Sequence, residues 1–512
     1  MKKLLLISLL SLPIAGFAQE DENSFVAEGV YSLYVSPNGQ WFGSRAGDAS
    51  IYDFKDRSYI YYDECFFGLG NTIADNGMAV GEMHDTGVLM YQGNMIFPPT
   101  LSKYWFCDLN AITPDASRLT GLFNNTDRNG VYYVPFVADI AADGTVGEPI
   151  PLPYPKKDLF GAPPQFVTAV WISSDGHTVI GQVLDWRGMY SYPICYTEDE
   201  NGEWSYSLPS ESLFNPNHIE LPENPWLSEY PFPEPEDFMS GLLRNDYLEA
   251  YDRFISGLGS EPNPYNYMSE EEIEEYEEAV EKYNEWFEAN KGLMNEYHKI
   301  YLQVLQTSPS FSANDMALHP SGEYFMMHGG VENQEGDMIG TIYQFTKDGE
   351  ISIVNAPDGS YFPAQILPDN TLIVARGMAA GPASYIRLAG SEEFITLEEY
   401  LETSHPELAT WVSTLCANGQ GRLCVNDDMT VFSNALVAEQ LFGYDGETDY
   451  YYNTMFIELA QAGIESIINV EDTDIYKVYN LQGVKVLETK DFSALNSLKG
   501  LYVINGKKVM LK

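Results

Sequence analysis

The stretch Ile172-Ser173-Ser174-Asp175-Gly176-His177-Thr178-Val179-Ile180-Gly181 decides the fold of this chain, because altered copies of it recur along the sequence. In each copy an apolar residue ends one strand, and a pair such as Asp-Gly or Asn-Gly then supplies the positive φ that reverses the chain. Proline fixes φ within several of these turns. Each copy is therefore a hairpin signal, and the copies begin at Val35, Ile73, Ile112, Ile172, Leu318, Ile366 and Val425.

The spacing of the copies predicts a β-propeller. With the fourth residue of each copy as the marker, the steps along the chain are 38, 39, 60, 146, 48 and 59 residues. All but the fourth step fit the roughly 40 to 50 residues of a four-stranded blade, if the longest of them carry loop insertions. Residues 130–137 and 188–196 alternate in polarity and are rich in tyrosine, as strands are. We expect an all-β fold of about seven blades. Six and eight stay open, because the copies at Ile366 and Val425 lack the turn glycine.

The net charge of the chain limits the classes of partner that it can bind. The 512 residues include 27 Lys and Arg against 75 Asp and Glu, so the formal net charge is −48. Such a charge repels phosphate backbones and anionic lipid, so we expect no binding to nucleic acid or to a membrane surface. Because 45% of the residues are hydrophobic, the chain has enough apolar side chains for a substantial core.

The first 18 residues predict export. Lys2 and Lys3 precede an apolar run from Leu4 to Ile14, and a small residue, Ala18, ends the segment. This is the pattern of a secretory signal peptide, and no segment is apolar over the length that a membrane span needs. We therefore expect a secreted protein without a membrane span, located in the periplasm, on the outer-membrane surface or outside the cell. The propeller is expected over residues 19–460.

The long fourth step predicts an acidic helical insert at about residues 205–308. Residues 198–299 hold 26 acidic and 5 basic side chains, a net of −21. Apolar residues at helical spacing predict one helix over 237–255 and another to about residue 305, the second starting at a capping box formed by Ser269 and Glu272. We expect an antiparallel helical hairpin whose aromatic stripe packs against the first helix and the propeller. Gly292 is a candidate interruption of the second helix.

A separate β module is predicted at residues 466–512. From Glu471 onward there are 5 acidic residues and 7 lysines, in a chain that is otherwise strongly acidic. Short alternating strands are expected at 475–479, 484–487 and 500–504, and Asn505-Gly506 then turns the chain into a final strand. We expect these strands to form a small β-sandwich-like module.

Two resemblances follow from these residues. The turn repeats resemble the extracellular repeats of secreted bacterial β-propellers. The tail is similar to the type A C-terminal sorting domain of type IX (Por) secretion cargo from Bacteroidetes, on the landmarks Val478-Tyr479-Asn480 with Gly483, Gly500-Leu501-Tyr502 and the final lysine-bearing strand. The second resemblance implies the type IX secretion machinery as a partner and a tail that is often removed during anchoring. Here the last hairpin is more compact than in that family.

The sequence carries no catalytic, cofactor-binding or metal-ligating motif, and no residue is assigned to those roles. Nucleophile elbows, His-Glu-x-x-His and phosphate loops are absent, and the polar stretches 124–130 and 445–449 are poor calcium loops. His84, His177, His319 and His328 lie near expected turns, where we interpret them as solvated residues; a cluster at the channel mouth stays open as the alternative. Cys416 and Cys424 either form a disulfide or are two buried thiols.

We therefore expect a secreted or cell-surface binding propeller for a glycan or protein ligand, without a cofactor and more plausibly a binding protein than an enzyme. The ligand site would be the central funnel, where loops from every blade converge. Two alternatives stay open. One is an extracellular hydrolase or lyase that acts on polysaccharide through funnel carboxylates, and the other is a structural surface protein stabilised by calcium.

Overall fold

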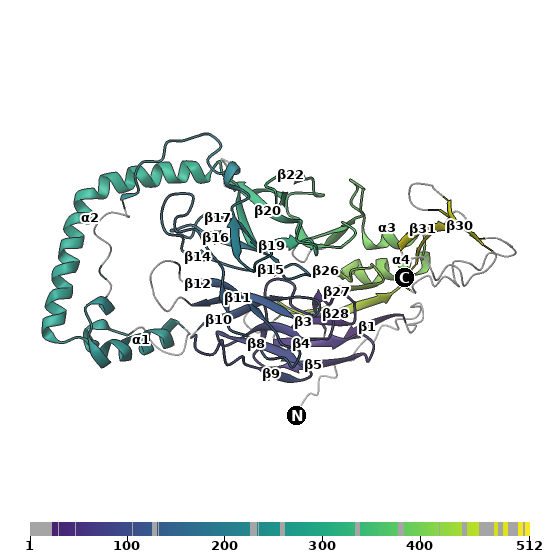
Figure 1. Ribbon diagram of the computed structural model, residues 1–512, viewed down its shortest axis with the longest axis horizontal. Coiled ribbons are helices and arrows are strands. Elements are labelled where there is room, and N and C mark those ends of the chain that lie inside the picture. Colours follow the sequence, from purple (N-terminus) through teal and green to yellow (C-terminus); the bar gives the residue numbers. More distant parts are fainter. Residues whose placement is uncertain are drawn as a thin grey trace, which may run out of the picture.

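The computed structural model confirms the propeller and gives it seven blades in the part of the chain that it describes. Seven antiparallel sheets follow one another around a ring, and each contacts the next. Figure 1 shows this body in the middle of the molecule. The described residues are 23–28, 30–46, 48–104, 106–124, 131, 133–225, 233, 235–255, 262–332, 338–376, 383–418, 420–442, 448–459, 476–479, 485–489, 500–504 and 507–511. The expected signal peptide at residues 1–18 lies outside them.

The first four blades are numbered here in chain order. The inner strands of blades 2 to 4 are buried along most of their length, as expected where each sheet packs between two others. Blade 1 has β2 (Ser32–Val35), β3 (Trp41–Ala46), β4 (Asp48–Asp53) and β5 (Ser58–Tyr62); blade 2 has β6 (Phe66–Phe67), β7 (Ala79–Met83), β8 (Thr86–Tyr91) and β9 (Asn94–Ile96); blade 3 has β10 (Cys107–Ile112), β11 (Arg118–Asn124), β12 (Tyr133–Asp139) and β13 (Ile150–Pro151); blade 4 has β14 (Phe166–Val167), β15 (Trp171–Ile172), β16 (Thr178–Leu184), β17 (Ser191–Glu198) and β18 (Trp204–Ser207).

The remaining blades follow the arm that leaves blade 4. In blade 6 a single bridge between Ile386 and Ile395 stands where a fourth strand would be, and two short helices follow it. Blade 5 has β19 (Ser310–Leu318), β20 (Tyr324–Glu332), β21 (Met338–Thr346) and β22 (Ile351–Val354); blade 6 has β23 (Phe362–Ile366), β24 (Leu372–Ala375) and β25 (Ser384–Arg387), then α3 (Leu397–Glu402) and α4 (Pro406–Leu415); blade 7 has β26 (Gln420–Val425), β27 (Val431–Phe442) and β28 (Thr448–Glu458).

The N-terminal strand closes the ring. The strand β1 (Ser24–Glu28) pairs antiparallel with β28, so it is the outermost strand of blade 7. Phe456 is fully buried at the seam between blades 7 and 1, where its ring lies 4.9 Å from those of Phe42 and Tyr52 and 5.3 Å from that of Phe25. The two ends of the propeller thus share one aromatic core.

The insert forms an arm between blades 4 and 5. It contains η1 (Glu211–Leu213), η3 (Pro235–Asp237), α1 (Gly241–Ile255), η4 (Pro264–Tyr267) and α2 (Glu270–Leu305). The predicted capping box at Ser269 and Glu272 is present. In Figure 1 α2 bends along its length. The helix continues through Gly292, so the interruption predicted there does not occur. The expected first helix begins at Gly241 rather than at residue 237, because η3 occupies the preceding turn.

The C-terminal residues form a sheet of their own, which Figure 1 places at the far end of the molecule from the arm. Its strands are β29 (Tyr476–Tyr479), β30 (Lys485–Thr489), β31 (Gly500–Ile504) and β32 (Lys507–Leu511), in the order β30-β29-β31-β32. The predicted turns at Asn480 to Gly483 and at Asn505-Gly506 lie outside the described residues. Within the described residues no helix is both long and apolar enough to cross a membrane.

Candidate functional site

The seven turns predicted from the sequence share one geometry. In each, the backbone N–H of the fourth turn residue donates to the carbonyl of the first, at 2.8 to 3.1 Å. The fourth residue has a φ between 56° and 82° in all seven, including the three turns without glycine. This common conformation makes all seven copies blade turns, and we call the end of the propeller that carries them the turn face. The fourth residues are Gly39, Gly77, Ala116, Gly176, Gly322, Asn370 and Met429.

Hydrogen bonds between neighbouring turns follow from the residue at the second turn position. Asp75 N–H donates to Pro114 O at 2.8 Å, Ser174 N–H to Pro320 O at 2.8 Å, and Asp427 N–H to Pro37 O at 2.9 Å. Proline has no N–H and can only accept, whereas Asp and Ser can donate. Blades 2 and 3, 4 and 5, and 7 and 1 are joined in this way.

These turns surround a cavity at the turn face that all seven blades line. About 80 Å³ of it is open to the centres of water molecules. A volume of that size holds a few waters or one small group of a ligand. The cavity is therefore narrower than the open funnel expected from the sequence. Its charged lining residues are Arg422 and Asp427.

An inner segment of blade 2 reaches past blade 3 to blade 4 and narrows the channel. Asn71 Nδ2 donates to Ile112 O in blade 3 at 2.9 Å, and its Oδ1 accepts from Ile172 N in blade 4 at 3.3 Å. A Cβ on Gly70 would lie 2.0 Å from Val170 O, so only glycine permits this approach. Asn110 Nδ2 adds a further bond, to Ala169 O at 3.0 Å. Blades 2, 3 and 4 thus contact one another along the propeller axis.

Asp427 is the acidic group of the cavity. Burial, together with the nearby carboxylates of Asp75 and Asp428, raises its pKa to about 7. Asp75 differs, because its Oδ1 accepts from Asn38 N–H at 2.8 Å. Burial raises the pKa of Asp75 and this bond opposes the change. The Asp427 carboxyl consequently gains and loses its proton near neutral pH.

The other polar lining groups bind neighbouring blades. Arg422 Nη2 donates to Ala364 O of blade 6. The Gln365 side chain pairs with the backbone of Val425, accepting from its N–H at 3.2 Å and donating to its carbonyl. These groups hold blades 6 and 7 together, so Asp427 is the lining side chain with the clearest chemistry for a ligand.

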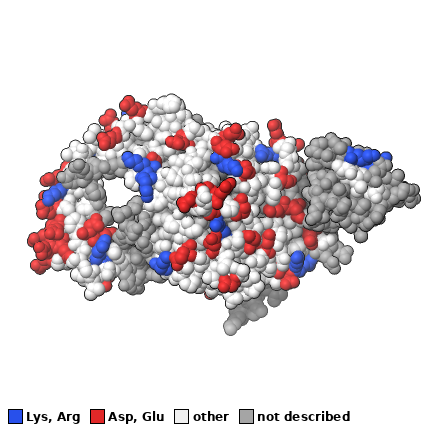
Figure 2. Space-filling model, viewed as in Figure 1, with Lys and Arg blue, Asp and Glu red and all other residues white. Residues whose placement is uncertain are grey.

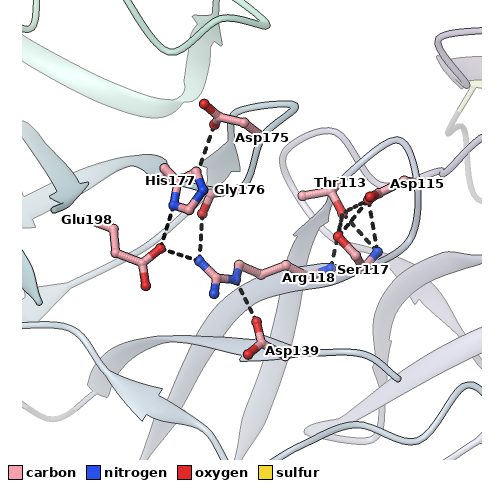
Figure 3. A network of polar contacts seen from close by, with 9 residues as sticks. All are labelled: Thr113, Asp115, Ser117, Arg118, Asp139, Asp175, Gly176, His177 and Glu198. Carbon is pink, nitrogen blue, oxygen red and sulfur yellow. Dashed lines mark hydrogen bonds and ion pairs between the residues drawn. The ribbon is translucent and has the colours of Figure 1, made fainter. Parts of the chain in front are cut away.

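A second polar network lies on the turn face between blades 3 and 4 (Figure 3). Arg118 donates from Nε to Asp139 Oδ1 at 2.7 Å, and from Nη1 to Glu198 Oε2 at 2.5 Å. Its Nη1 also donates to Gly176 O at 3.2 Å, and His177 Nδ1 lies 2.7 Å from Glu198 Oε2. The Glu198 side chain is only 7% exposed. A buried carboxylate needs such partners, so the network joins two blades and serves stability.

The position that Arg118 holds in blade 3 is occupied by other residue types in two other blades. Arg118 begins the second strand of blade 3 and contacts the turn glycine of blade 4. Trp41 occupies the same position in blade 1 and lies over Gly77 of blade 2. Thr178, at this position in blade 4, contacts Gly322 of blade 5. We interpret this position as the packing contact from each of these blades to the next.

The four histidines do not meet at the cavity. His84 pairs with Glu64 and His177 with Glu198, while His319 contacts Ser321 and His328 contacts the Gly359 carbonyl. All five cysteines, Cys416 and Cys424 among them, are free thiols. No group of three or more His, Cys, Asp or Glu side chains that could hold a metal ion occurs among the described residues. The stretches 125–130 and 443–447, which include most of the two weak calcium-loop candidates, lie outside those residues.

Comparison with known proteins bears on the fold alone. No family model matches the chain, and no curated protein matches it. Similar solved structures include the β-propeller domain of the Trilobed protease from Pyrococcus furiosus, with 8% identity, a TM-score of 0.28, and 96% of this chain and 98% of that one covered. Another is the periplasmic gluconolactonase PpgL of Pseudomonas aeruginosa, with 10% identity, a TM-score of 0.29, and 83% and 81% covered.

A third similar structure is prolyl oligopeptidase B from Galerina marginata, with 10% identity and a TM-score of 0.36. The match covers 83% of this chain but 46% of the peptidase chain. Similarity at this level carries no activity from one protein to another. The ring of seven blades is established by the strand pairing described above, and the functional assignment depends on this chain's own residues.

Proposed function

We propose that this protein is a secreted binding propeller whose glycan or protein ligand contacts the mouth of the turn-face cavity. The observation that supports this most directly is a cavity to which every blade contributes and whose lining includes a carboxyl group that titrates near neutral pH. The volume of the cavity limits what enters to a small group, such as a hydroxyl-bearing arm of a sugar or a short side chain. The remainder of the ligand would lie across the surrounding turns.

A hydrolase or lyase is the second candidate, supported by Asp427 and Asp75, two carboxyl groups of raised pKa on different blades. Glycoside hydrolysis needs two carboxyl groups that both reach the substrate. Asp427 lines the cavity, while Asp75 is bound to the Asn38 backbone. Binding without turnover is therefore the better supported function. In the part of the chain that the structure describes, no comparable observation favours a calcium-stabilised structural role.

Export completes the proposal. The signal peptide at residues 1–18 and the sorting-like tail at 466–512 support passage through the type IX secretion machinery to the outer-membrane surface or beyond. The tail strands β29 to β32 form a separate sheet, as a removable module would. A fusion of residues 466–512 to a periplasmic reporter in a type IX-competent host tests this part. Surface exposure of the reporter supports the route, and retention in the periplasm contradicts it.

The binding function is tested by obstructing the cavity. Ser174 is exposed and lines the mouth, and its bond to blade 5 uses only backbone atoms. The variant Ser174→Tyr should block the mouth and keep the fold, and Ser207→Tyr on the exposed outer strand β18 is the matched control. On a glycan array and against candidate surface proteins, the wild type and Ser207→Tyr should bind and Ser174→Tyr should not. Equal binding by all three excludes this site, and release of reducing ends from a bound polysaccharide would favour the hydrolase.

A further inference from the structure

The arm carries a stripe of side chains on one face of α2. Trp286, Asn290, Leu293, Tyr297 and Ile300 follow one another at alternating steps of four and three residues. In a helix this spacing places all five in a single line, the seam by which one helix contacts another segment. All five line one groove.

The two ends of α2 are packed, and exposure is mixed between them: Met294 and the seam residue Tyr297 are buried, whereas the other seam residues are partly or largely exposed. Near the start, Tyr276 is buried in a cluster with Tyr247 of α1. Near the end, Tyr301 is buried against the propeller, and its hydroxyl donates to Asp185 Oδ2 at 2.6 Å. Between them Leu293 is 59% exposed. The fixed ends hold the stretch between them in place, so the groove is formed before any partner arrives.

The opposite wall of the groove is the proline-rich segment 220–225. Glu220 and Glu223 lie on this wall, and Glu296 lies on the helix. The described residues that line the groove include no Lys, Arg or His, and the groove has about 640 Å³ open to water. Figure 2 shows acidic side chains gathered on the outer part of the arm and an opening between the arm and the propeller body. An aromatic and aliphatic floor with acidic edges is thus available on an exposed surface.

We propose that this groove docks a cationic segment of a partner protein that also carries large apolar side chains. Leu293 and its neighbours on the seam would bury the apolar side chains. The carboxylates of Glu220, Glu223 and Glu296 would attract Lys or Arg at the edges, and the net charge of −21 over residues 198–299 would steer the encounter. An acidic peptide or a phosphate-bearing ligand would be repelled. The site is separate from the turn-face cavity and does not depend on its function.

The test uses the full chain and three labelled synthetic peptides of equal length, composed of Lys and Leu, Lys and Ser, or Glu and Leu. Fluorescence anisotropy should show binding of the Lys–Leu peptide that weakens with salt, and far weaker binding of the other two. The triple variant Glu220→Gln, Glu223→Gln, Glu296→Gln should weaken Lys–Leu binding about tenfold. The single variant Leu293→Ser should weaken it by a similar factor, roughly that of losing one buried leucine.

The matched control changes three glutamates of α2 outside the groove. Glu271→Gln, Glu274→Gln and Glu275→Gln alter the net charge by the same amount at exposed positions. This control should bind as the wild type does, and circular dichroism should show unchanged helix content in every variant. Equal weakening in both triple variants would show a diffuse electrostatic attraction and overturn the proposal. So would a dimer of this chain, detected by light scattering, that Leu293→Ser dissolves, since a second copy would then be the occupant.

Discussion

The contact between the second strand of one blade and the turn of the next can be measured at Gly77. This glycine has a φ of +82°, and a Cβ there would lie 2.7 Å from the ring of Trp41 in blade 1. Gly144 has a φ of +84° in a similar turn, and no heavy atom lies within 4 Å of its Cβ position. The two glycines therefore differ in their neighbours and not in their backbone.

The magnitude follows from two contributions. Alanine at positive φ costs about 1–2 kcal/mol in the folded state, and its lower entropy in the unfolded chain offsets about 0.4–1 kcal/mol of that. Gly144→Ala should therefore destabilise the protein by about 1 kcal/mol. Gly77→Ala adds an overpacked contact worth about 1–3 kcal/mol, for a total of about 2–4 kcal/mol.

Equilibrium urea unfolding followed by far-ultraviolet circular dichroism measures both variants. In a Trp41→Ala background, the effect of Gly77→Ala should fall to that of Gly144→Ala, because the ring that it meets is gone. The reasoning is refuted if the two glycine variants cost the same in the wild-type background. It is equally refuted if the cost of Gly77→Ala is unchanged without Trp41.

Three further outcomes are expected. Phe456→Ala should destabilise the protein by about 3–5 kcal/mol in urea unfolding, because it empties the core of the closing seam, and a loss below about 1 kcal/mol would contradict that role. Arg118→Met should cost about 1.5–3 kcal/mol by the same measurement, since Glu198 then keeps only His177; an unchanged midpoint would mean that the network adds nothing. The folded-state pKa of Asp427 is raised to about 7 from 3.8, so its carboxyl binds a proton more tightly in the folded state. As the pH rises from about 4 to about 7, the stability of the wild type should therefore fall more steeply than that of Asp427→Asn. Melting temperatures that follow parallel pH profiles in the two proteins would argue against the raised pKa.

The turns made the fold predictable, because Pro, Gly, Asp and Asn act on the backbone locally. Even the turns with Ala116, Asn370 or Met429 as their fourth residue adopt the same positive φ. At Ala116 and Met429 the environment in the ring overrides the preference of the residue, whereas asparagine adopts this conformation readily. The capping box at Ser269 was readable for the same reason. An equal signal at Thr396 and Glu399 marks α3, for which no helix was predicted.

The candidate site was less predictable, because its determinants are contacts between blades. Nothing around Gly70 indicates that its backbone meets Val170 near the propeller axis, so the narrowing of the channel could not be foreseen. The alternation of Pro with Asp or Ser at the second turn position was visible, but their partners depend on the order of the blades. The raised pKa of Asp427 likewise arises from burial and from Asp75, which is remote in sequence.

The seam between β1 and β28 also has a consequence for how the molecule reaches its final state. Phe25 of β1 pairs with Phe456 of β28, so the first strand has no strand partner until almost all of the propeller has been made. Ser32 N–H, at the start of blade 1, likewise donates to the hydroxyl of Thr454, a residue 422 positions later. Contacts so distant in sequence form late and slowly. If the chain crosses a membrane with its N-terminus first, the propeller therefore stays unclosed during transit. The ring closes only after β28 has crossed as well. Truncation at either end of the propeller should leave the unclosed ring as the final product.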